Sequence, residues 1–208
     1  MDGVSWQQAP APQRQRSTTV TALWVIALFV ALLYAVELLD QLTGSGLQRV
    51  GGIEPRETDG LDGILFAPLL HGPWTHLMAN TVPILIFGFL LLLAGVRRWL
   101  EVTVVVWLVG GVGVWLTGGT GSLHVGASVL VFGWLCYLLL RGVYSRQPGQ
   151  LALGLLLLLL YGGLLWGVLP GQPGISWQGH LFGAIGGWLA ARRFGRADRL
   201  SGRSPGWP

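Results

Sequence analysis

Charged side chains are scarce in this chain of 208 residues. They make up 11% of the sequence, against about 25% in an average soluble domain. Lysine is absent, so all 13 basic residues are arginines, whose positive charge is permanent. The single cysteine, Cys136, lies within an apolar run, which excludes a framework of disulfides. With 52% hydrophobic residues, the composition excludes an ordinary soluble domain and is typical of a membrane protein.

Six long stretches carry no charge, and each is close to the ~20 residues that a helix needs to cross the hydrocarbon core. The fold class that we expect is all-α: a polytopic membrane protein with a bundle of six transmembrane helices. The expected domains are a flexible cytoplasmic tail at 1–17, a membrane domain at 18–195 and a second cytoplasmic tail at 196–208. The helices are expected at about 18–38, 74–96, 101–118, 125–141, 151–169 and 178–194.

The arginines are distributed unevenly between the two sides of such a bundle. Eleven of the 13 fall in the tails and loops of one side, and the other side holds only Arg49 and Arg56 together with six acidic residues. Cytoplasmic loops are enriched in arginine, so we expect both termini in the cytoplasm of a bacterial cell. Because the arginines are spread along the membrane edge without interleaved aromatic residues, the expected partner is membrane lipid, and nucleic acid is excluded.

The first outer loop, roughly 41–73, is long and contains an uncharged apolar stretch, GILFAPLL, at 63–70. A loop of this kind is expected to lie partly submerged in the outer leaflet of the membrane.

Polar residues stand near the outer ends of three expected helices. His76 and Asn80 open the second helix, Ser128 the fourth and His180 the sixth. All three helices run from outside to inside, so these side chains should meet at one depth. Polar groups within a bilayer are costly and normally face the bundle or a water-filled cavity. Their convergence therefore indicates a functional site.

The chemistry of these residues favours a nucleophilic serine. Ser128 needs a neighbouring base to take its proton, and His180 can exchange a proton near neutral pH. A triad carboxylate is excluded because Glu101, at the cytoplasmic end of the third helix, is the only acid between 63 and 197. We therefore predict a Ser128–His180 dyad. Donors for the oxyanion would be the Ser128 amide, His76 and Asn80, the last two spaced i, i+4 on one helix face.

Glycines are placed where this dyad needs close packing. Gly183 and Gly187 follow His180 on one face of the sixth helix, where small residues let a partner backbone approach. If the partner is the fourth helix, His180 comes within reach of Ser128. Gly126 precedes Ser128 and allows the backbone angles that a loop needs on entering the bilayer.

Three motifs give the chain a resemblance to the rhomboid intramembrane serine proteases over roughly 18–195. They are HxxxN at His76 and Asn80 with His71 five residues before, GAS at 126–128, and HLFGAIGG at 180–187. The resemblance implies a protease that cuts transmembrane segments of membrane proteins near the extracytoplasmic face. It also implies Ser128 as nucleophile, His180 as base, an oxyanion hole of His76, Asn80 and the Ser128 amide, and neither metal nor cofactor.

Val129 departs from this family pattern, which has glycine directly after the serine. That glycine normally begins a small-xxx-small contact between the fourth and sixth helices, in which Gly133 supplies the second small position. A valine is expected to push these helices apart. This feature favours an alternative function, a silenced rhomboid-like pseudoprotease that binds transmembrane segments without cutting them.

A small transporter or channel subunit is a further alternative, but it predicts polar residues along a path through the membrane. The polar cluster here stops near the outer side, which suits a water-filled active-site cavity better. Among the other histidines, His71 is expected to bond backbone in the submerged loop, and His124 to be a solvated loop residue.

Overall fold

The regular structure of this protein is helical throughout the part of the chain that the computed structural model describes, residues 13–172 and 174–201. The one strand-like pairing in that part is an isolated antiparallel bridge between Ile53 and His124. Five helices are long and apolar enough to cross a membrane. They are α1 (Thr18–Leu42 within Gln13–Leu42), α4 (Trp74–Leu92), α5 (Val96–Thr117), α6 (Ser128–Ser145) and α7 with its extension η3 (Pro148–Val168).

The last helix, α8 (Trp177–Leu200), is longer than four of these five spans but less apolar. Its first 15 residues, 177–191, are uncharged, and its last turns carry four arginines and Asp198. The prediction of an all-α bundle is confirmed, and a sixth crossing by α8 stays a prediction.

Several helix ends differ from the predicted ones. The chain turns at Gly95, whose φ is 101°, so α4 ends at Leu92 and α5 begins at Val96 with the two arginines of the predicted turn in its first turn. The first helix runs from 13 to 42 where 18–38 was expected, so residues 13–17 of the predicted tail are helical. The rest of that tail, 1–12, lies outside the described residues.

The remaining boundaries shift for local reasons. α6 begins at Ser128 and continues to Ser145, because Arg146 adopts a left-handed conformation that ends it. Pro148 starts α7, which passes into the 3-10 helix η3 (Gly162–Val168). α8 reaches Leu200, so residues 196–200 extend the helix although they were predicted in the tail.

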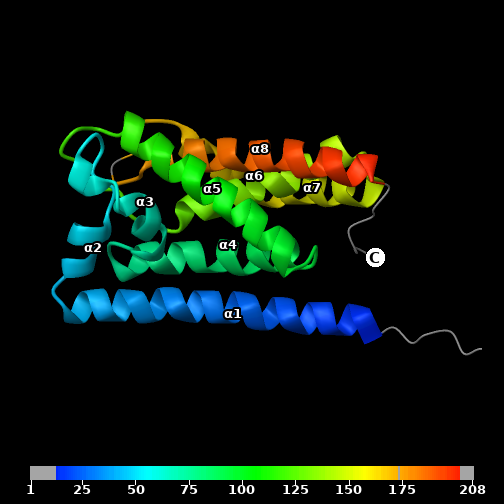
Figure 1. Ribbon diagram of the computed structural model, residues 1–208, viewed down its shortest axis with the longest axis horizontal. Helices are drawn as coiled ribbons and strands as arrows, with labels where there is room; N and C mark the ends of the chain where they lie inside the picture. The colour runs from blue at the N-terminus through cyan, green and yellow to red at the C-terminus, as the bar shows by residue number, and fades with distance from the viewer. Residues whose placement is uncertain (1–12, 173, 202–208) are drawn as a thin grey trace, which may run out of the picture.

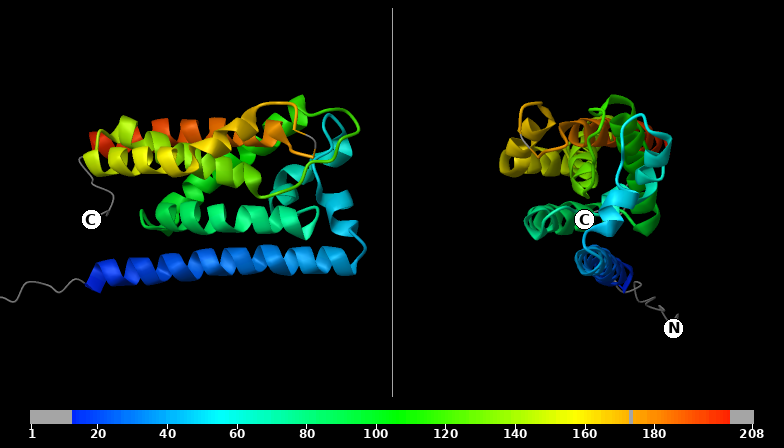
Figure 2. Two further views of the ribbon diagram at one scale, coloured as in Figure 1. Left: turned by 180° about the vertical axis from the view of Figure 1, so that it is seen from behind. Right: turned by 90° about the vertical axis from the view of Figure 1, so that its left-hand side faces the viewer.

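α6 and α8 pack side by side at the centre of the bundle, and α5 crosses them obliquely (Figure 1). α4 packs against α6, α1 covers α4 on the outside, and α7 covers α6 (Figure 2). α6 contributes much of the core: Trp134 is fully buried, and its indole N–H donates to Thr103 Oγ1 of α5 at 3.1 Å. The N-terminal end of α1 and the C-terminal end of α8 lie at the same end of the bundle (Figure 1).

The segment between α1 and α4 folds into four short helices at the opposite end. They are α2 (Gly46–Gly51), η1 (Thr58–Gly60), α3 (Gly63–Phe66) and η2 (Ala67–Leu69). α3 packs on α5, where the indole N–H of Trp107 donates to the Ile64 carbonyl at 2.8 Å. The apolar stretch at 63–70 is thus held against the bundle, and its depth in the membrane stays a prediction.

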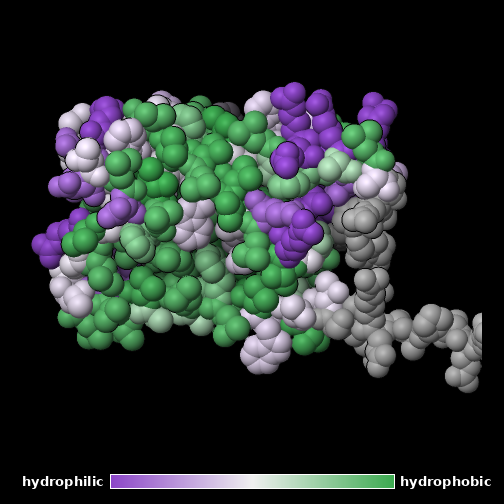
Figure 3. Space-filling model, in the orientation of Figure 1, coloured by the Kyte–Doolittle hydropathy of each residue, from purple (hydrophilic) through white to green (hydrophobic). Residues whose placement is uncertain are grey.

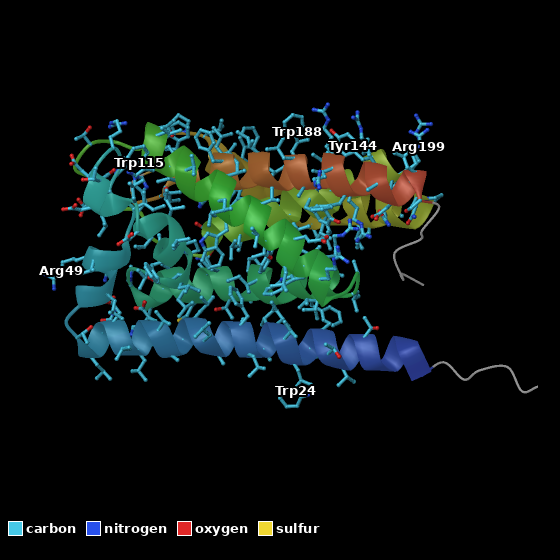
Figure 4. The ribbon with its side chains drawn as sticks, in the orientation of Figure 1. Trp24, Arg49, Trp115, Tyr144, Trp188 and Arg199 are labelled. Atoms are coloured by element: carbon cyan, nitrogen blue, oxygen red, sulfur yellow. The ribbon has the colours of Figure 1, made fainter. Side chains whose placement is uncertain are left out.

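The face of the molecule in Figure 3 has an apolar middle and a polar region toward each end. Arg49 projects from the end that carries α2, Arg199 from the opposite end, and Trp24 outward from the middle of α1 (Figure 4). The start of α5 and the end of α8 are joined by an ion pair between Arg98 and Asp198, with a shortest N···O distance of 2.9 Å.

Candidate active site

A cavity of about 750 Å³ lies near the short helices between α1 and α4, and Gln48 of α2 is among its lining residues. It is lined by His76 and Asn80 from α4, Ser128 from α6 and His180 from α8. Three helices thus place the four polar residues of the predicted site around one space.

Ser128 is the first residue of α6 and is partly exposed. The preceding Gly126 has a φ of 127°, which side chains rarely tolerate. A Cβ at this position would also lie 2.6 Å from the ring of His76. Only glycine therefore allows both the turn into α6 and the approach of the His76 ring.

The loop before Ser128 is fastened to the segment before α4. The amide of Gly126 donates to the Ala67 carbonyl at 2.9 Å, and the amide of Ala127 donates to His71 Nε2 at 3.2 Å. His71 is fully buried, and burial together with the nearby His76 lowers its pKa to about 3. Its ring is therefore neutral at physiological pH and can accept this bond, so His71 contacts backbone as expected.

His180 is 8% exposed and lies with its ring stacked on Phe132, with ring centroids 3.9 Å apart and an interplanar angle of 10°. Its Nδ1 lies 2.9 Å from the carbonyl oxygen of Gly167 in η3. A carbonyl can only accept, so Nδ1 carries the proton and Nε2 of the neutral ring keeps its lone pair. The ring is thus fixed in the tautomer that a general base toward serine requires.

Ser128 and His180 face one cavity without a direct hydrogen bond between their side chains in the described structure. Bonds between nucleophile and base are often long in resting enzymes and shorten when substrate binds. The two residues of the predicted dyad therefore line one cavity, and a hydrogen bond between them stays a prediction.

Asn80 is 7% exposed, and its buried Nδ2 lacks a hydrogen-bond partner within the described chain. Buried donors are normally paired, so an orphan donor beside a cavity calls for an explanation. His76 lies one turn before Asn80 and packs edge-on against His71, with ring centroids 5.3 Å apart. Both predicted oxyanion residues therefore stand at the cavity, one of them with a free donor.

The contact between α6 and α8 depends on glycines, as expected. A Cβ on Gly183 would overlap the carbonyl oxygen of Val129, and one on Gly187 would overlap that of Gly133. Gly133 is itself closely packed, because a Cβ there would overlap the side chain of Val106 on α5. The backbones of the two helices thus touch at Val129–Gly183, directly after Ser128, and one turn further along at Gly133–Gly187.

The expectation that Val129 widens this contact is wrong. Its carbonyl, not its side chain, faces α8, and the side chain points toward α5. There it occupies the space beside Gly110, where a Cβ would overlap Val129 Cγ2. A glycine on α5 therefore compensates for the missing glycine on α6.

His124 is not a solvated loop residue, which corrects a second expectation. Its Nδ1 lies 2.7 Å from Ser176 Oγ and its Nε2 2.8 Å from Ser122 Oγ, and all three residues line the cavity. Burial lowers the pKa of His124 below its usual value. No sequence motif marks it, because its partners come from a loop and from the start of α8.

No group of three histidine, cysteine or acidic side chains gathers as a metal would require, so far as the chain is described. The cavity brings together a serine hydroxyl, two histidine rings and an asparagine amide, which are residue types that acyl transfer uses.

Comparison with known proteins agrees with this arrangement. The family model described as the Rhomboid domain matches residues 60–197. The chain is 49% identical over 210 residues to uncharacterized proteins of Mycobacterium tuberculosis and Mycobacterium bovis, covering 92% of this chain and 87% of each relative. A relative from Mycobacterium leprae is 49% identical over 182 residues, covering 84% and 72%. This protein is an integral membrane protein that belongs to the rhomboid family, whose members are generally intramembrane serine proteases.

Proposed function

We propose that this protein is an intramembrane serine endopeptidase that cleaves transmembrane segments of other membrane proteins through a Ser128–His180 dyad. The observation that carries the proposal is the tautomer of the His180 ring. The Gly167 carbonyl holds the proton on Nδ1, so the lone pair of Nε2 is available in the cavity that Ser128 also lines.

In the first step, His180 Nε2 takes the proton of Ser128 Oγ as the oxygen attacks the scissile carbonyl carbon. In the described structure the partner of the imidazolium that forms is the Gly167 carbonyl, which accepts from its Nδ1–H in place of a carboxylate. His180 then gives the proton to the leaving amine, and water releases the acyl group from Ser128 by the same exchange in reverse.

The oxyanion of this reaction would be held by donors of residues that line the cavity. The amide of Ser128 is in the first turn of α6, where amides have no intrahelical acceptor. Asn80 Nδ2 is a buried donor without a partner, and His76 completes the set. Donors arranged before the reaction stabilise the charge without any cost of reorganisation.

The cavity lies at the end of the bundle opposite the arginine cluster of α8. If that cluster marks the cytoplasmic side, both termini are cytoplasmic and cleavage takes place near the extracytoplasmic face. A substrate helix must unwind there, because its scissile amide has to leave the helical hydrogen bonds to reach Ser128.

The test is labelling of the detergent-solubilised protein with a fluorescent fluorophosphonate, which reports an activated serine without a known substrate. Labelling is expected for the wild type and for Ser201→Ala, a serine at the far end of α8. It should be absent from Ser128→Ala and from His180→Ala, and mass spectrometry should place the adduct on Ser128.

Labelling that persists in Ser128→Ala, or a folded wild type that does not label, would contradict the proposal. In the second case the alternative, a pseudoprotease that binds transmembrane segments, becomes the better reading. Val129 was the feature that favoured it, and Gly110 accommodates that side chain.

A further inference from the structure

His124 and Ser176 hold equivalent positions in the two elements that carry the dyad. His124 stands four residues before Ser128, and Ser176 stands four residues before His180. Their side chains meet directly, with 2.7 Å between His124 Nδ1 and Ser176 Oγ. This contact links the loop that leads into α6 with the start of α8.

On the loop side, the backbone of His124 is fixed. Its amide donates to the Ile53 carbonyl at 3.0 Å and its carbonyl accepts from the Ile53 amide at 2.9 Å. Ile53 is itself buried at 4% exposure. The imidazole therefore projects from a rigid support.

On the helix side, Ser176 is the N-cap of α8, and its Oγ accepts from the Gly179 amide at 3.3 Å. Its carbonyl accepts from the amide of His180 at 3.2 Å. A shift of Ser176 would therefore also move the backbone of His180, the proposed base.

The directions of the hydrogen bonds are mutually consistent. Ser122 Oγ donates its one proton to the Gly119 carbonyl and can only accept from His124 Nε2–H. His124 Nδ1 then has a lone pair for the hydroxyl proton of Ser176, whose oxygen still accepts from Gly179. With His124 as the neutral Nε2–H tautomer, both of its ring nitrogens and the hydroxyls of Ser122 and Ser176 have hydrogen-bond partners.

We propose that His124 is a positioning residue, which through Ser176 sets the separation of Ser128 and His180. The backbones of α6 and α8 touch below the dyad, at Val129–Gly183 and Gly133–Gly187. These contacts hold the two helices on one side of Ser128 and His180, and on the other side the His124–Ser176 bond joins the segments that lead into the helices. This inference rests on the proposed function, because it assigns His124 to the reaction of that dyad.

Three substitutions test the bond. His124→Asn keeps an acceptor near the place of Nδ1, whereas His124→Gln reaches toward the place of Nε2 and loses the link to Ser176. Ser176→Ala removes the hydroxyl from the other side. Each variant is purified in detergent, its melting temperature is measured, and its maximal rate of fluorophosphonate labelling is separated from the probe concentration that gives half of that rate.

A displacement of about 1 Å can lower a rate on the order of a hundredfold, so we expect His124→Gln and Ser176→Ala to lower the maximal rate by roughly ten- to a hundredfold. The half-saturating concentration should stay the same. His124→Asn should recover most of the rate, and the double variant His124→Gln with Ser176→Ala should be no slower than the slower single variant. A structural role alone would lower the melting temperature and leave the labelling rate of the folded fraction unchanged.

Folded variants that label at the wild-type rate would overturn the positioning role while the dyad stands. Equal losses in His124→Asn and His124→Gln would also overturn it, because only the first keeps the acceptor. A wild type that does not label overturns the proposed function and this inference together. If His124→Gln fails to fold, Ser176→Ala and His124→Asn decide the question.

Discussion

The side chains of the proposed dyad can be identified from the sequence, but the groups that orient them cannot. Ser128 and His180 stand out because polar residues are rare in apolar helices. The partner of His180 is the carbonyl of Gly167, and every residue has a carbonyl, so no residue type signals it. His124 was missed for a similar reason, since its role depends on a contact between a loop and α8 that spacing along the chain does not reveal.

Asn80 offers a prediction that separates stability from activity. Its buried Nδ2 has no partner in the described structure, and an unsatisfied buried donor costs about 1–3 kcal/mol. Asn80→Leu, which keeps the approximate size, should therefore raise the melting temperature. It should also lower the rate of fluorophosphonate labelling by about 10²–10³-fold, the usual loss for one oxyanion donor. A lower melting temperature would instead indicate a structural tie between α4 and the loop.

The lowered pKa of His71 predicts that the free energy of unfolding of the protein decreases at acidic pH. Its pKa in the folded protein is about 3, below the ~6.5 of an unfolded histidine, so the unfolded state takes up the proton first. The stability from the neutral ring is fully present above about pH 6.5 and declines as pH falls from there toward 3.

A comparison with His71→Gln measures this contribution, because glutamine keeps an acceptor for the Ala127 amide and does not titrate. We expect similar melting temperatures for both proteins in detergent at pH 7.5 and a higher one for His71→Gln at pH 5. Parallel curves for the two proteins would show that His71 does not contribute to the acid sensitivity.

At the scale of the elements, the sequence predicts the helices well and their ends poorly. Hydropathy locates each apolar run, but a helix can extend beyond it, as α6 does to Ser145 and α8 to Leu200. Helices end where the backbone leaves the helical conformation, as it does at the positive φ angles of Gly95 and Arg146. The packing of Val129 was mispredicted because a motif names the residue and not the direction of its side chain.

The contact between Val129 and Gly110 predicts a pair of compensating substitutions. Gly110→Ala adds a Cβ that overlaps Val129 Cγ2, and such overpacking typically costs about 1–3 kcal/mol. It should lower both the melting temperature and the labelling rate. Val129→Gly in the same chain removes the overlapping atoms and should restore much of each.

Gly183→Ala is the matched control, because its Cβ would overlap a backbone carbonyl of Val129 that no side-chain substitution removes. Val129→Gly should therefore rescue Gly110→Ala and leave Gly183→Ala impaired. Equal rescue of both would contradict the packing described for Val129.

At the scale of the whole molecule, a crossing by α8 determines whether both ends of the bundle's chain lie on one side of the membrane. α8 has 24 residues and is about 36 Å long at 1.5 Å per residue, enough to span the core. Its arginines lie in the last turns, where long side chains can reach the lipid headgroups. An even number of crossings returns the chain to the side where it started. Six crossings therefore agree with Figure 1, in which the N-terminal end of α1 and the C-terminal end of α8 lie at one end of the bundle, and we expect that end in the cytoplasm.

Two positions at opposite ends of the bundle test this orientation, Arg49 and Arg199 (Figure 4). The only cysteine is Cys136, so Cys136→Ser gives a background free of thiols into which Arg49→Cys or Arg199→Cys is placed. Because the arginine-rich side should face the cytoplasm, a membrane-impermeant maleimide should label the Arg49→Cys protein in intact cells and the Arg199→Cys protein only after lysis. The reverse pattern would invert the topology and place the cavity, with Ser128, at the cytoplasmic face.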